Sequence, residues 1–95
     1  MKKTGKQVHI VKRRGHRERF DERKVYASCY AACLSSHMAH ERAEVIAGNV
    51  TRIINKWVRT KATVTSGQVF REIGRVLARY DRDAAFMYRH HRDIS

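Results

Sequence analysis

Apolar residues recur at steps of three and four between His40 and Thr60, which is the clearest periodicity in the chain. They are Ala43, Ile46, Ala47, Val50, Ile53, Ile54, Trp57 and Val58. Because an α-helix turns once in about 3.6 residues, this spacing places all of them on one face. The pattern predicts a helix over residues 40–60 whose wide apolar side must be covered by other elements.

Three shorter helices are predicted around this one. Asp21 is a good N-cap, and apolar residues at intervals of four predict a helix over residues 22–36. Thr65 and Gln68 have the spacing of a capping box, which predicts the start of a third helix, with Ser66 as the alternative cap. Asp81 is a second cap or turn residue, and a fourth, shorter helix follows it.

The segment before these helices is typical of a β-hairpin. Residues 8–13 are partly alternating and β-branched, Arg14-Gly15 is a turn signal, and residues 17–20 would form the returning strand. Residues 62–64 favour a third small strand. An isolated hairpin is only marginally stable in water, so it needs a layer to pack on. We therefore predict an α+β fold that is mostly helical, with the hairpin and third strand capping a bundle of about four helices.

The chain has 95 residues, enough for one domain, and a formal net charge of +12. Ten Lys or Arg stand against three acids in the first 24 residues, so the charge is concentrated at the N-terminal end. We interpret residues 1–7 as a flexible basic lead-in and residues 8–95 as the domain. Such a charge favours anionic partners. No run of 18 apolar residues and no signal peptide occur, so we expect a cytoplasmic protein without a membrane partner.

Cysteine, histidine and carboxylate patterns give little support for metal binding or catalysis. Cys29 and Cys33 share the apolar face of the first predicted helix, so we expect buried, reduced thiols. Cys33, His37 and His40 are close in sequence, but zinc sites usually need four converging ligands, and we expect no metal here. No nucleophile elbow and no Walker A loop occur, so we expect no enzymatic activity.

The hairpin and the first helix carry the charges most typical of a binding site. Lys12, Arg13 and Arg14 cluster at a strand end, and Lys24 lies one turn into the helix. Together they could hold a phosphorylated ligand, while Glu18 could accept a hydrogen bond from an exocyclic amine. The alternative is a solvated basic face on which Glu18 balances nearby arginines. The residues by themselves favour neither interpretation.

Two motifs resemble the ATP-cone domain family. They are Val11-Lys12-Arg13-x-Gly15 followed by Glu18-x-Phe20-Asp21-x-x-Lys24, and the later Thr65-Ser66-x-x-Val69. The resemblance covers about residues 8–92 and includes the order of the elements. It implies a hairpin and helical bundle that enclose ATP or dATP, as in ribonucleotide reductases and the repressor of their genes.

The resemblance also implies roles for individual residues. It assigns phosphate contacts to Lys12 and Arg13, and adenine contacts to Glu18 and to the backbone at Val11. Further nucleotide contacts fall on Asp21, Lys24 and a hydroxyl that is either Thr65 or Ser66.

The sequence departs from the family pattern at two places. Arg14 stands before the hairpin glycine, where the family usually has Asp or Asn; it either adds a phosphate contact or alters the turn. Met87 stands where the last helix usually carries a basic residue. The residues that would complete this end of the site are Tyr88, Arg89, His91 and Arg92.

No reductase body and no zinc ribbon accompany the motifs, so the chain is either a stand-alone cone or a fragment. We predict a regulatory module that binds ATP or dATP, with Mg²⁺ as a companion ion. It would act through a homo-oligomer or through a partner such as ribonucleotide reductase or its DNA-associated control. The alternative is a small basic nucleic-acid-binding protein, whose affinity would fall steeply with salt.

Overall fold

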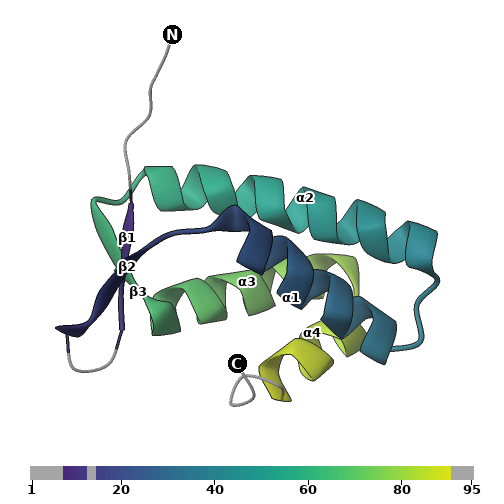
Figure 1. Ribbon diagram of the computed structural model, residues 1–95. Helices are drawn as coiled ribbons and strands as arrows, with labels where there is room; N and C mark the ends of the chain where they lie inside the picture. Colours follow the sequence, from purple (N-terminus) through teal and green to yellow (C-terminus); the bar gives the residue numbers. More distant parts are fainter. Residues whose placement is uncertain (1–7, 13–14, 91–95) are drawn as a thin grey trace, which may run out of the picture.

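The computed structural model describes residues 8–12 and 15–90. The elements in chain order are β1 (His9–Val11), β2 (Arg17–Arg19), α1 (Glu22–Ser35), α2 (His40–Arg59), β3 (Thr63–Thr65), α3 (Ser66–Tyr80) and α4 (Arg82–His90). This order confirms the predicted α+β class, dominated by helix, with a small sheet at the N-terminal end (Figure 1). The predicted lead-in at residues 1–7 lies outside the described residues, as do Arg13, Arg14, His91 and Arg92.

The three strands form one sheet with β1 in the middle, antiparallel to β2 and parallel to β3. The register pairs Ile10 with both Glu18 and Val64, so these three side chains point to the same face. Ile10 and Val64 are only 8% and 1% exposed. This is the inner face of the sheet, and it packs toward the helices (Figure 1).

Each strand has three residues, so the hairpin strands are shorter than predicted. The regular strand pairing ends at Val11, and from Lys12 onward the backbone makes the hydrogen bonds of the turn. The Lys12 N–H donates to the His16 carbonyl at 2.7 Å, and the Gly15 N–H donates to the Lys12 carbonyl at 3.2 Å. Gly15 has a φ of 75°, which glycine adopts without steric cost. The predicted turn at this glycine is confirmed, and it tightens the hairpin end.

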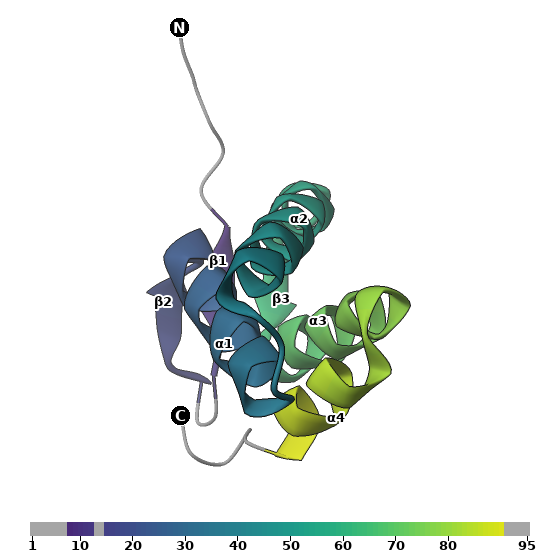
Figure 2. The ribbon, with the colours of Figure 1, turned by 90° about the vertical axis from the view of Figure 1, so that its right-hand side faces the viewer.

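The four helices pack in a closed ring, since α1 and α3 each contact both α2 and α4. Figure 2 shows them arranged around a common interior. Most of the predicted apolar face of α2 is buried there, while Ile53 and Trp57 are half-buried against the same core. The largest fully buried side chains come from α1, α2, β3 and α3 and are Ile54, Leu77, Val50, Val58, Val64, Val76, Cys29 and Cys33.

The predicted helix caps at Asp21 and Thr65 are both present. Asp21 accepts a hydrogen bond from the Arg23 N–H at 3.0 Å at the start of α1. Thr65 and Gln68 form the full reciprocal capping box of α3. Asp81 Oδ1 accepts from the Ala84 N–H at 2.9 Å, which identifies it as the cap of α4. These bonds satisfy N–H groups that the helices leave unpaired at their first turns.

The thiols of α1 are buried and free, as predicted. Burial raises the pKa of the Cys29 thiol to about 12, because a thiolate would lose its solvation there. His40, which the sequence placed near Cys33, has its Nδ1 only 2.6 Å from the Tyr30 hydroxyl instead. The cysteines therefore belong to the packing of the core.

Candidate functional site

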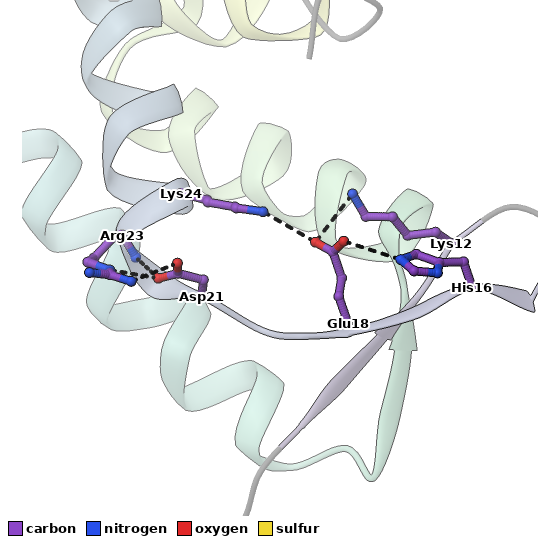
Figure 3. Close-up of polar contacts among 6 residues, drawn as sticks. All are labelled: Lys12, His16, Glu18, Asp21, Arg23 and Lys24. Atoms are coloured by element: carbon purple, nitrogen blue, oxygen red, sulfur yellow. Dashed lines mark hydrogen bonds and ion pairs between the residues drawn. The ribbon is translucent and has the colours of Figure 1, made fainter.

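Four charged or polar side chains converge on the inner side of the hairpin. Glu18 Oε1 accepts from Lys24 Nζ at 3.3 Å and lies 3.4 Å from Lys12 Nζ. Glu18 Oε2 lies 3.8 Å from His16 Nε2. These residues come from β2, α1 and the hairpin turn, and we call them the Glu18 cluster (Figure 3). The sequence predicted three of its members as site residues but did not single out His16.

The geometry of the Glu18 cluster follows from local structure. Glu18 points inward because it pairs with the buried Ile10 in the sheet. Lys24 reaches it from the first turn of α1, which begins directly after β2. Lys12 reaches it from the end of β1, where the turn brings the two strands together. The fold thus places two ammonium groups on one carboxylate oxygen.

The charges in the cluster are unequal: two lysines face one carboxylate. The hydrogen bond from Lys24 and the nearby charge of Lys12 lower the pKa of Glu18, so it is ionised at neutral pH. The side chains of Lys12 and Lys24 remain 44% and 71% exposed. The cluster is therefore open to a solute and carries a net positive charge.

Asp21, another predicted site residue, lies apart from the Glu18 cluster. Its carboxylate accepts from the Arg23 backbone N–H and from the Arg23 guanidinium at 3.2 Å. These bonds hold the pKa of Asp21 below its usual value. Figure 3 shows the two groups as separate, with Asp21 turned toward Arg23. In this structure Asp21 serves first as the cap of α1.

The other predicted residues lie where β3 passes into α3. Val11 pairs with Thr65 across β1 and β3, so both are at the same end of the sheet. The Thr65 hydroxyl is engaged in the capping box, whereas Ser66 is half-buried at the first residue of α3. Within the described part of the chain, no hydrogen bond involves the Ser66 hydroxyl.

The end of α4 packs on α3, from its first turns to its middle. The ring of Tyr88 stacks on Phe70 with centroids 5.0 Å apart. The Arg89 guanidinium lies over Gly74, where an added Cβ would sit 3.1 Å from its Nε. Gly74 thus lets Arg89 lie close to α3.

A family model described as the ATP cone domain matches residues 8–94, nearly the whole chain. The chain belongs to the ATP-cone family. It is therefore a nucleotide-binding regulatory module, since ATP cones bind ATP or dATP as allosteric effectors. No curated protein matches the chain.

This ATP cone has further features that bear on function. Over residues 8–12 and 15–90, no helix has the length and apolar character of a membrane span. The same part of the chain holds no group of three or more His, Cys, Asp or Glu side chains suited to a metal ion. What the described structure does bring together is Lys12, Glu18 and Lys24, the centre of the predicted site.

Proposed function

We propose that this ATP cone binds ATP or dATP at the Glu18 cluster and transmits the binding to another chain. The main support for the proposal is that Lys12 and Lys24 both lie against one carboxylate oxygen of Glu18. A polyphosphate carries more negative charge than Glu18 and would take both ammonium groups in charge-assisted hydrogen bonds. The lysines are exposed, so they can change partner without unfolding the site.

The same exchange would give the site its preference for adenine. Once the lysines turn to phosphate, Glu18 is left as an acceptor on the inner face of the sheet. Adenine offers an exocyclic amine at the position where guanine has a carbonyl oxygen. The Glu18 carboxylate would bind the amine and repel the carbonyl. We therefore propose selectivity for ATP or dATP over GTP.

The remaining predicted contacts surround this centre. We propose that the Val11 backbone contributes to the base side and that Ser66 contributes the hydroxyl, because Thr65 already caps α3. Asp21 would act by fixing the start of α1, which carries Lys24. Further contacts to the phosphates, with Mg²⁺ as companion ion, are proposed for Arg13, Arg14, Tyr88, Arg89, His91 and Arg92.

The regulatory output would act on a second copy of this chain or on a partner such as ribonucleotide reductase or its transcriptional control. A cytoplasmic location would fit the two free thiols, because thiols stay reduced there. Residues 8–95 would form the nucleotide-binding domain, preceded by the basic segment.

Calorimetric titration with ATP, dATP and GTP in the presence of magnesium tests this proposal. We expect ATP or dATP to bind and to raise the melting temperature, and GTP to do so much less. At about 100 times its dissociation constant, a ligand adds about 2.7 kcal/mol to the free energy of unfolding. Absence of any melting shift with millimolar ATP or dATP would refute the proposed function.

A further inference from the structure

The outer face of the sheet is basic and lies opposite the Glu18 cluster. Alternation along the strands places Arg17 and Arg19 on the side away from Glu18. His9 pairs with both Arg19 and Thr63, so these three form a row across the sheet. Both arginines and Thr63 are exposed. Glu18, the one carboxylate in the three described strands, points to the inner face, so the outer face carries no acid.

The basic face continues onto the C-terminal end of α2. A hollow of about 340 Å³ is lined by Arg19 on one side and by Asn55 and Arg59 of α2 on the other. Within residues 8–12 and 15–90, Arg19 and Arg59 make no ion pair. Asp21 and Glu22 also line the hollow, and the Asp21 carboxylate pairs with Arg23. Three arginines against two acids leave the lining with a net positive charge.

The sequence around Arg59 strengthens this positive surface. From residue 45 to residue 71 the chain has no Asp or Glu, yet it has five Lys or Arg. This stretch contains the second half of α2, all of β3 and the first turns of α3. The last four turns of α2 therefore carry no carboxylate that could neutralise Arg59. The outer face of the sheet and the end of α2 form one anion-attracting surface.

The side chains on this surface suit one class of polyanion better than others. The described outer positions of the strands carry no Phe, Tyr or Trp, and the one ring among them, the imidazole of His9, is half-buried. Stacking on large exposed rings is the usual basis of single-strand binding. The exposed large apolar side chains among the described residues are Val45 and Phe86, on α2 and α4, not on this sheet. A lipid surface would need such side chains at the contact. Arginine and threonine side chains are instead typical contacts to the phosphates of a duplex.

We propose that the outer sheet face, continued by Arg59, binds the sugar-phosphate backbone of double-stranded DNA without sequence preference. The inference goes beyond the proposed nucleotide function, since it uses the opposite face of the sheet and different residues. DNA would bind through Arg17, Arg19 and Arg59, while the nucleotide would bind through Lys12 and Lys24.

Fluorescence anisotropy with a labelled duplex of about 20 base pairs, at roughly 50 and 200 mM salt, tests the proposal. We expect Arg17→Gln/Arg19→Gln to weaken binding about tenfold, because two phosphate contacts are lost. The slope of log affinity against log salt should become shallower by about 1.8, or about 0.9 for each phosphate. The Arg17→Lys/Arg19→Lys variant keeps both charges and should retain most of the affinity.

Two control variants sharpen the test. Arg82→Gln removes an exposed charge at the start of α4. That position lies at the far end of α3 from the sheet, and at 1.5 Å per residue α3 is about 22 Å long. This variant should leave DNA affinity nearly unchanged. Lys24→Ala should weaken ATP binding and spare DNA binding, whereas Arg17→Gln/Arg19→Gln should do the reverse.

Three results would overturn the proposal. One is an equal loss of affinity in Arg82→Gln and Arg17→Gln/Arg19→Gln, which would mean that only diffuse charge acts. Another is tighter binding to a single strand of the same length, or to vesicles of anionic lipid, than to the duplex. The third is unchanged duplex affinity in Arg17→Gln/Arg19→Gln. Circular dichroism should show the same helix content in every variant, because each substituted side chain is exposed.

Discussion

The helical core and the hairpin end of this ATP cone are built in opposite ways. In the core, side chains such as Ile54 and Leu77 are completely buried, and the described residues include no buried charged side chain. At the hairpin end, Glu18 of β2, Lys12 after β1 and Lys24 in the first turn of α1 are partly or largely exposed. The core has many packing contacts and the hairpin end has many exposed charges.

This difference indicates that stability and ligand binding belong to different regions. Burial of apolar area stabilises the fold, whereas exposed ion pairs contribute little to it. The Glu18 cluster can therefore exchange partners with a ligand at small cost to the fold. A substitution in one region should change its own property and leave the other nearly unchanged.

The largest effect should come from Leu77→Ala in the core. Removing this fully buried side chain should lower the free energy of unfolding by about 2–5 kcal/mol, because it leaves a cavity. Urea denaturation measures the change, and the folded fraction should still bind ATP with unchanged affinity. Val45→Ala is the control: its side chain is 61% exposed, so the cost should stay within about 0.5 kcal/mol. Similar costs for the two would contradict the contrast between core and surface.

The next largest effect should come from Lys12→Ala and Lys24→Ala at the hairpin end. Each should weaken ATP binding about ten- to a hundredfold, since each removes a charge-assisted contact to phosphate. The free energy of unfolding should hardly change. Arg52→Ala on the exposed side of α2 is the matched control, measured by the same titration. If all three variants lose the same affinity, and no more than added salt removes, the assigned pocket is wrong.

A smaller effect is expected at Thr65, where the two regions meet. Thr65→Ala removes the side-chain half of the capping box of α3 and should cost about 1 kcal/mol of stability. Thr65→Ser keeps the hydroxyl and should restore most of it. Thermal denaturation of the three proteins provides the comparison. Equal losses in both variants would show that the methyl group, not the hydroxyl, matters.

The smallest effect should appear as a pH dependence of stability at Glu18. Hydrogen bonding to Lys24 and the charge of Lys12 lower the pKa of Glu18 in the folded state. The stability it contributes is present above its unfolded pKa and is lost as pH falls through the lowered folded pKa. Glu18→Gln should therefore show a shallower loss of melting temperature in acid than the unmodified protein. Identical acid profiles would mean that the cluster makes no net contribution to the fold.

The core could be predicted from the sequence more fully than the site. Regular apolar spacing and local caps such as Thr65 depend on neighbours in sequence, and these predictions were confirmed. Asp21 was predicted both as a helix cap and as a site residue, and its bonds to Arg23 confirm the cap. Its separation from Glu18 depends on the path of the chain from β2 into α1, which no local pattern indicates. The hollow beside Arg59 depends on how α2 ends against the link between β2 and α1. No pattern among neighbouring residues in the sequence indicates that arrangement.

Mapping of backbone amide chemical shifts during an ATP titration would show directly where the nucleotide binds. We expect the shifts to concentrate at Lys12, His16, Glu18, Lys24 and Ser66, with little change over the first half of α2. GTP at the same concentration should produce much smaller shifts. Shifts centred on α2, or equal shifts with both nucleotides, would contradict the claim that the inner side of the hairpin recognises adenine nucleotides.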